Sequence, residues 1–342
     1  MPAGREKDAN LKYKDMDFIS KINFKRLFKE DDGKFYIACG LKLSCVSFFT
    51  IVFISYHIWM ILSLNSTFFE SVGYFKSMNL REAFFDHSLK ALIDQLPLIF
   101  FFIICIFFVG MYVGYILLRP FAVIGSYCQD LAEKENTLYN PDLFSDYRLL
   151  SRFSELFFQY VNQCKIEKKF RPNTMPNYYS KVRGPVLEKV FLFHFLIITT
   201  IISVMTVWFC SYLTLEIRSQ VIELSLQTLS KNSDVVAYFL NNQGQVFESL
   251  LWGAGISVFI SYFALCFHLY GKVSGAIFAF FSTMRAIMKG NTNARIHLIG
   301  YAHIRPYGRM FNKFMDYSVN EFAKEEKKVK SHIREIDSKK VK

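Results

Sequence analysis

The sequence predicts an all-α membrane protein with four transmembrane helices and two tandem cytoplasmic helix–connector–helix units. Three observations support this fold class. The composition, with 52% hydrophobic residues, 38 Phe and a mean hydropathy of +0.20, is too apolar for an ordinary soluble protein. Four long segments contain no Asp, Glu, Lys or Arg. The order of two apolar segments followed by a helix–connector–helix unit occurs twice along the chain.

The four uncharged segments cover residues 43–64, 96–118, 190–215 and 249–271. Each reaches the length of about 20 residues that a helix needs to cross the hydrocarbon of a bilayer. A backbone at that depth has no water to bind, so each segment is expected to be helical. Four buried core helices of this kind would need a large soluble shell, which this sequence lacks.

The basic residues predict how the chain is oriented. Of the 41 Lys and Arg, 35 lie in residues 1–35, 119–189 and 272–342, whereas 65–95 and 216–248 carry only five. Because cytoplasmic loops are rich in Lys and Arg, both termini and the middle segment are predicted to be cytoplasmic. Attraction of these flanks to anionic membrane lipid accounts for the net charge of +12, so no nucleic-acid partner is expected.

The chain divides into seven parts on this basis. They are a basic N-terminal segment (1–35), a first transmembrane pair (36–118), a first helix–connector–helix unit (119–170), a linker (171–189), a second transmembrane pair (190–271), a second unit (272–322) and a charged tail (323–342).

Apolar residues repeat at heptad-like spacing behind the second span of each pair, which is typical of a coiled-coil-like helix. The same spacings of 3, 4 and 3 occur at an offset of 156 residues, in Phe121, Ile124, Cys128 and Leu131 and in Ile277, Phe280, Met284 and Ile287. A second amphipathic helix is predicted in each copy, with stripes Leu149, Phe153, Leu156, Tyr160 and Ile304, Tyr307, Phe311, Phe314.

The second copy resembles a HAMP domain, the helical linker of bacterial membrane receptors and sensor kinases. In that family a glycine ends the first helix, a connector carries spaced apolar residues, and the second helix contains a Phe-Asn pair. The matching residues are Gly290, Arg295, Ile296, Phe311 and Asn312, and in the first copy Pro120 matches a proline common near the start of the domain.

The resemblance has departures in both copies. The Asp-Glu-x-Gly that often begins the second helix is replaced by residues 303–306, His-Ile-Arg-Pro, and the first copy has Lys134 or Glu135 in place of the connector glycine. The second copy therefore matches the pattern more clearly than the first.

The resemblance implies a bacterial inner-membrane signalling protein, in which Gly290 and Pro120 would act as hinges. The packed seam would contain Phe121, Ile124, Leu131, Ile277, Phe280, Met284, Phe311 and Phe314. Two helices cannot bury their apolar faces alone, so the two copies are expected to form one intramolecular four-helix bundle, or each to pair with a second chain in a homodimer.

Small residues predict close helix packing inside the membrane. Gly110 and Gly114 are four apart in the second span, and Ser249, Gly253, Ser257 and Ser261 form a stripe on one face of the fourth. The histidines His57, His194 and His268 have no acidic partner within a span, so packing or interhelical hydrogen bonding is favoured over a proton relay.

Catalysis is not expected, because no nucleotide-binding, nucleophile or metalloprotease motif is present. The seven cysteines lack metal-ligand spacing and are interpreted as reduced, buried thiols, and no cofactor is predicted. The favoured hypothesis is a signal-transduction component, without an output domain of its own, that acts on a cytoplasmic or membrane protein partner. The alternative is a structural subunit of a secretion, motility or pilus machine, and a small transporter or channel ranks third.

Overall fold

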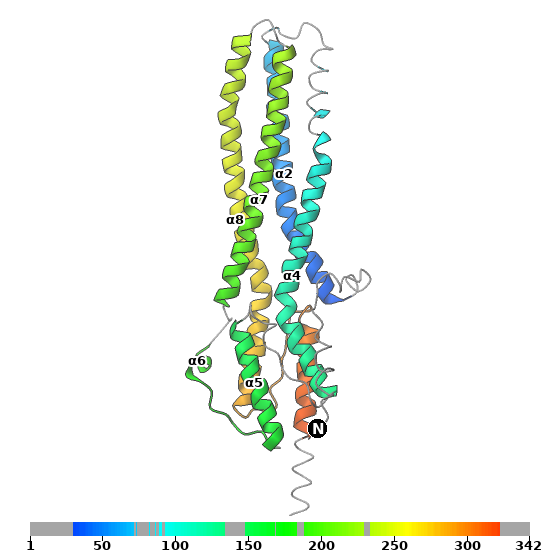
Figure 1. Cartoon of the computed structure of the whole chain (residues 1–342), viewed down its shortest axis with the longest axis vertical. Helices are drawn as coiled ribbons and strands as arrows, with labels where there is room; N and C mark the ends of the chain where they lie inside the picture. Colours follow the sequence, from blue (N-terminus) through cyan, green and yellow to red (C-terminus); the bar gives the residue numbers. More distant parts are fainter. Residues whose placement is uncertain are drawn as a thin grey trace, which may run out of the picture. The chain divides into compact units, whose positions relative to one another are not determined.

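A computed structural model describes residues 30–71, 93–133, 148–167, 169–182, 188–228 and 233–321, together with a few isolated positions between 73 and 90. Within these ranges all regular secondary structure is helical, which confirms the all-α prediction. The helices are α2 (Asp31–Ser71), α4 (Leu96–Glu133), α5 (Arg148–Glu167), α6 (Asn177–Ser180), α7 (Lys189–Thr228), α8 (Ser233–Met288) and the helical residues 305–321 (Figure 1).

Four of these helices are long and apolar enough to cross a membrane. The qualifying stretches are Asp31–Ser71, Leu96–Ala132, Lys189–Gln220 and Asn242–Met288. They contain the four predicted spans, and each helix continues beyond its uncharged segment. The chain is therefore a multi-pass membrane protein. Most of the predicted N-terminal segment and the tail from residue 322 onward lie outside the described residues.

The chain forms two compact units. The membrane unit comprises residues 39–111 and 193–269, and the helical-bundle unit comprises 1–38, 112–192 and 270–342, of which only the described residues are considered. Each transmembrane helix contributes residues to both units, since the boundaries fall within α2, α4, α7 and α8.

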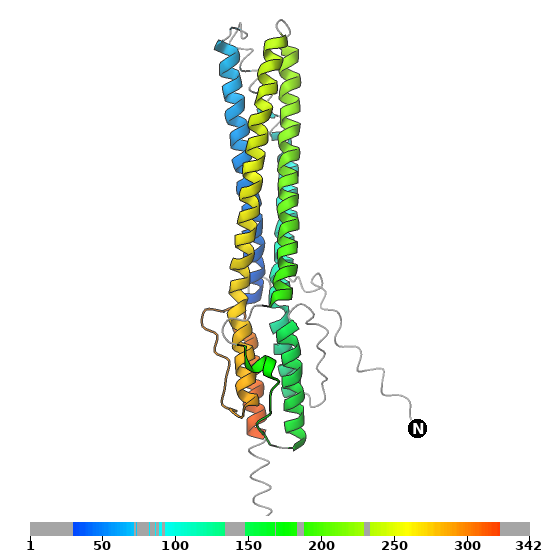
Figure 2. The same cartoon turned by 90° about the vertical axis from the view of Figure 1, so that its left-hand side faces the viewer.

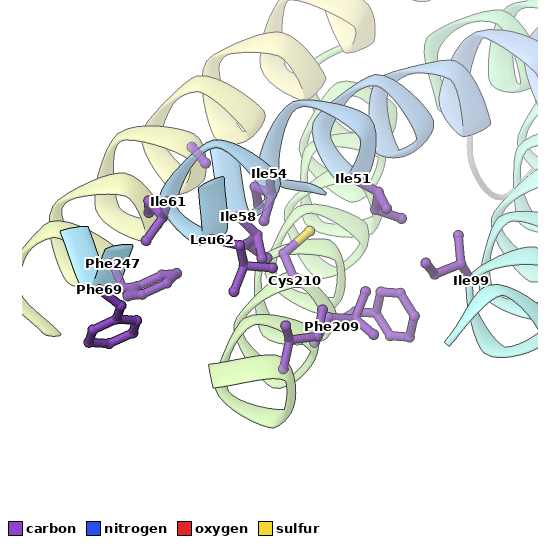
Figure 3. Packing of buried hydrophobic residues seen from close by; sticks show 13 residues of the cluster. Ile51, Ile54, Ile58, Ile61, Leu62, Phe69, Ile99, Phe209, Cys210 and Phe247 are labelled. Atoms are coloured by element: carbon purple, nitrogen blue, oxygen red, sulfur yellow. The ribbon is translucent and has the colours of Figure 1, made fainter. Parts of the chain in front are cut away.

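The core of the membrane unit lies where α2 faces α7 and α8. Ile51, Ile54 and Ile58 follow one face of α2 and pack in one cluster with Phe209 and Cys210 of α7 (Figure 3). These side chains are spaced three and four residues apart, so they project from the same side of the helix. Figures 1 and 2 show α7 and α8 side by side over their membrane-spanning residues.

Gly110 holds α4 close to α2. A methyl group at Gly110 would lie 2.8 Å from Gly40 Cα, and one at Gly40 would lie 2.8 Å from the Phe107 carbonyl oxygen. The close approach of the two backbones thus requires glycine on both helices. Gly114, one turn further along α4, is buried.

A buried polar cluster joins three of the transmembrane helices. Ser47 Oγ of α2 lies 2.5 Å from the Tyr262 hydroxyl of α8 and 3.0 Å from Thr206 Oγ1 of α7. The Tyr262 hydroxyl also donates to the Leu43 carbonyl at 3.0 Å. Hydrogen bonds between hydroxyls substitute for water at this depth and fix the register of the three helices.

The small-residue stripe of α8 is not in a tight contact with another described helix. Ser249, Gly253 and Ser257 are exposed, and no heavy atom lies within 4 Å of a methyl group placed on Gly253. Together with Ser261 these residues line an open groove. The α8 residues that pack in the core of the unit are Phe247 and Ala254, which lie in one apolar cluster with side chains of α2 and α7.

Candidate functional site

The candidate site is the helical-bundle unit, in which both helix–connector–helix copies contribute to one core. Phe121 of α4 lies 5.3 Å from Phe280 of α8, between ring centroids, and Phe280 lies 6.0 Å from Phe311 in helix 305–321. Phe157 of α5 lies 5.6 Å from Phe311. The first and second copies therefore meet within a single chain.

The stripe residues predicted at the seam are almost fully buried. The exposed fraction is 8% or less for Phe121, Ile124, Cys128, Leu131, Ile277, Phe280, Met284, Ile287, Phe311 and Phe314. Each aromatic pair in such a core contributes about 0.5–1.5 kcal/mol beyond its area burial. The apolar stripes of each copy are thus buried because the two copies pack against each other.

The buried face of α5 differs from the predicted one. Leu149 and Leu156 are only partly buried, whereas Leu150, Phe157 and Phe158 are fully buried. Phe158 contacts Tyr127 of α4 at 4.6 Å and Phe314 at 6.3 Å between ring centroids. The strict heptad spacing chosen from the sequence omitted the two adjacent phenylalanines, which together widen the apolar face beyond a narrow seam.

Pro120 lies inside α4, which continues through it to Glu133. Proline removes one main-chain hydrogen bond of the helix and is the usual cause of a local bend. Its ring is buried, as are the neighbouring residues Leu118 and Phe121. The connector of the first copy, including Lys134 and Glu135, lies outside the described residues.

Gly290 ends α8 with a left-handed turn. Its φ is 98°, its N–H donates to the Ile287 carbonyl at 2.9 Å, and the next N–H, of Asn291, donates to the Ala286 carbonyl at 3.0 Å. This pair of bonds is the Schellman arrangement, which satisfies the last carbonyls of a helix and favours glycine at this position. The chain thus leaves α8 where the sequence predicted.

The connector of the second copy packs onto the helix that follows it. Ile296 and Leu298 are buried, and a methyl group on Gly308 would lie 3.2 Å from Leu298 Cδ1 and 3.3 Å from Ile296 Cγ2. Asn312 fixes the connector through two hydrogen bonds, because its Oδ1 accepts from Ile296 N–H at 2.8 Å and its Nδ2 donates to the Ile296 carbonyl at 2.9 Å.

Arg295 adds a charged link in the same place. Its guanidinium donates to Asp316 Oδ1 at 2.7 and 2.8 Å and to the Thr292 and Ala294 carbonyls at 2.7 and 2.8 Å. The Arg295 side chain is 19% exposed, so solvent screens this link only in part. The connector is therefore held to helix 305–321 by both main-chain and side-chain bonds.

The linker between the copies caps two of the bundle helices. The Glu188 carboxylate accepts from the N–H groups of Leu149 and Leu150, at 3.2 and 2.9 Å, at the start of α5. The Glu188 N–H donates to the Tyr270 hydroxyl oxygen at 2.7 Å. At the far end of α8, the Asn173 N–H donates to the Met288 carbonyl at 2.9 Å. These bonds satisfy main-chain groups that a helix leaves unpaired at its ends.

Burial raises the pKa of the Glu188 carboxyl, although its two backbone hydrogen bonds oppose that shift. The residue is 4% exposed. The sequence predicts only that Glu188 lies in the linker 171–189. In the sequence, Glu188 is distinguished only as an acidic residue within a basic linker. Its helix-capping partners lie 38 and 39 residues away in the chain, so no local pattern indicates the contact.

The first turn of α2 contacts the second copy. The Phe35 ring stacks on His303 with centroids 4.2 Å apart and an interplanar angle of 10°, and the Tyr307 hydroxyl bonds to Asp32 Oδ2. Burial lowers the pKa of His303 below its ordinary value. His303, the first residue of the His-Ile-Arg-Pro stretch, thus makes an aromatic contact with the start of α2.

The chemistry of the unit is that of packing and hydrogen bonding. The seven cysteines are free thiols, and the described residues contain no group of three or more His, Cys, Asp or Glu that could hold a metal ion. Comparison with protein-family models, with curated proteins and with solved structures finds no match to this chain. The class of protein defined here is a multi-pass helical membrane protein.

Proposed function

We propose that this protein is a signal-transduction component of a bacterial inner membrane, with both termini in the cytoplasm. It relays movement of its transmembrane helices to a protein partner through two HAMP-like units packed as one intramolecular bundle. The orientation is supported by the 35 Lys and Arg of the three segments assigned to the cytoplasm against five in the two outer segments.

The observation that supports the proposal best is the position of Phe280. It lies on α8, which contains both a membrane span and a bundle segment, and its ring contacts Phe121 of the first copy and Phe311 of the second. A shift or rotation of α8 therefore changes the packing of both copies together. Packed helices respond to such shifts by moving between discrete arrangements, which is the property a relay requires.

Spin-label distances test the relay directly. Asn65 of α2 and Gln243 of α8 are hydrogen-bonded at 3.0 Å, so the double variant Asn65→Cys, Gln243→Cys places two thiols on facing sides of these helices and is first tested for disulfide formation on oxidation. Nitroxides carried by noncanonical amino acids at the exposed positions Ser126 and Lys313 leave the native cysteines unlabelled. We expect oxidation to shift or narrow the Ser126–Lys313 distance distribution in lipid nanodiscs, and the single variant Asn65→Cys to show no change.

The same measurement separates the relay from the alternative role as a structural subunit. A static scaffold would keep one distance distribution in the oxidised and reduced states, and that result would overturn the relay. Isolation of the protein in a stoichiometric assembly with its neighbours would then favour the structural role.

The partner-facing step is tested by breaking the core. Phe311 is fully buried, so Phe311→Asp should disorder the bundle while membrane insertion persists, and Arg309→Asp on the exposed face of the same helix serves as the control. Photo-cross-linking from Lys313 should capture a partner in the unaltered chain and lose it in Phe311→Asp. Capture that survives the Phe311 change would argue against a role for the packed seam.

A further inference from the structure

An open groove runs along the membrane unit between α2 and α8. Its volume is about 580 Å³, within the range of small-molecule sites. Phe49 and Phe53 of α2 form one wall, with exposed fractions of 66% and 49%. The small residues Ser249, Gly253 and Ser257 of α8 leave the groove wide, and no heavy atom lies within 4 Å of a methyl group placed on Gly253.

A basic pair bridges the two helices beyond one end of the groove. Lys42 Nζ of α2 lies 3.3 Å from His268 Nε2 of α8. Lys42 precedes the groove residues Val46 and Phe49 by four and seven positions, and His268 follows Ser261 by seven, so both lie on the groove faces of their helices. At 1.5 Å per residue the pair is roughly 6–10 Å along the helices from the groove lining.

This arrangement of charge and apolar surface matches one molecule that the membrane supplies. A phospholipid has a phosphate at the depth of the headgroups and acyl chains below it. Lysines near the ends of spans place their ammonium groups at that same depth. The ammonium has three N–H donors, and the contact with His268 uses at most one of them.

A second groove in the same unit provides a contrast. It lies between α7 and α8, has a volume of about 590 Å³, and is lined by Trp208, Trp252 and Glu248. The two grooves are similar in size and both are largely apolar. The charged residue in the lining of the α7–α8 groove, Glu248, is acidic. The α7–α8 groove therefore lacks the charge complementarity to phosphate that Lys42 gives the α2–α8 groove.

We propose that the α2–α8 groove is a binding site for an anionic phospholipid of the leaflet that the basic segments face. One acyl chain lies between Phe49 and Phe53 on one side and Gly253 on the other, and the phosphate contacts Lys42 Nζ. This site depends on the transmembrane assignment of α2 and α8 and does not depend on the signalling role.

Native mass spectrometry of the purified full chain, with equal amounts of dioleoyl phosphatidylglycerol and dioleoyl phosphatidylcholine added, tests the proposal. We expect the chain to retain phosphatidylglycerol preferentially. A basic residue near a membrane surface contributes about 1 kcal/mol to binding of anionic lipid, so Lys42→Gln should reduce this preference about fivefold.

Gly253→Leu tests the acyl-chain part of the site. Its side chain would occupy open space, and we expect it to reduce retention of the bound lipid at least tenfold without lowering thermal stability. Gly271→Leu is the matched control, because that glycine is also on α8, also has no heavy atom within 4 Å of an added methyl group, and does not line the groove. If Gly253→Leu aggregates, Ser257→Leu fills the same groove.

Three outcomes would overturn the proposal. The unaltered chain could retain both lipids equally, or Lys42→Gln could leave the preference unchanged. Gly253→Leu could also abolish a dimer while lipid retention persists, which would show that a second copy of the chain covers the groove.

Discussion

The Asn312 side chain binds both main-chain polar groups of Ile296, with hydrogen bonds of 2.8 and 2.9 Å. Ile296 in turn is 4% exposed and packs against Gly308, so one asparagine fixes the depth at which the connector is buried. A buried main-chain group without a partner costs about 1–3 kcal/mol, which makes this contact a determinant of the second copy's structure.

Asn312→Ala should therefore lower the free energy of unfolding of the bundle by about 1–3 kcal/mol. The amide of Ile296 loses its acceptor, and hydrogen–deuterium exchange of residues 291–300 should accelerate. Lys313→Ala, on the neighbouring exposed position, serves as the control. Unchanged exchange of the connector in Asn312→Ala would show that these two bonds do not hold it.

Gly290→Ala should destabilise the second copy by about 1–2 kcal/mol, because alanine pays a steric cost at the φ of 98° found there. The added methyl group would also lie 3.2 Å from Pro172 Cγ. Thermal unfolding in detergent micelles, followed by circular dichroism, measures the loss. Gly271→Ala, within α8, should be neutral or slightly stabilising, and equal behaviour of the two variants would contradict the strained-turn explanation.

Gly110→Ala should separate α4 from α2. The methyl group would lie 2.8 Å from Gly40 Cα, a backbone atom that moves only with its helix, and overpacking of this kind costs about 1–3 kcal/mol. The temperature at which the purified protein aggregates should fall. Gly253→Ala faces open space and should leave that temperature unchanged, so a comparable drop in both variants would refute the Gly40–Gly110 contact as the cause.

The stability of the bundle should depend on pH through Glu188. Burial raises the pKa of its carboxyl in the folded chain above the usual 4.5, so the folded state binds this proton more tightly than the unfolded state. Stability from this group therefore increases as pH falls through the folded pKa toward 4.5, and becomes constant below that value.

Glu188→Gln removes the titration and is the reference for this effect. The melting temperatures of the unaltered chain and of Glu188→Gln are measured from pH 8 to pH 4. As the pH falls, the melting temperature of the unaltered chain should rise relative to that of Glu188→Gln. Other carboxylates titrate alike in both chains and cancel. A difference that stays constant, or changes in the opposite direction, would show that Glu188 is not a desolvated acid in solution.

Features that depend on local composition can be predicted from the order of residues alone. Charges are expelled from hydrocarbon, so the uncharged runs marked the four spans, and a glycine after an apolar stripe marked the end of α8 at Gly290. The repeated stripes indicated that Phe121 and Ile277 lie on buried helix faces. They did not decide whether these faces meet in one chain or between two.

Features that depend on which distant segments meet follow from the packing of the folded chain. It placed Phe121 against Phe280 within one chain, brought Phe157 and Phe158 into the core, and left the Ser249–Ser261 stripe facing an open groove. It also brought Glu188 to the start of α5 and Lys42 to His268, pairs separated by 38 and 226 residues. Helical periodicity defines the faces of a helix, but the partner of each face is selected by packing with segments far away in the chain.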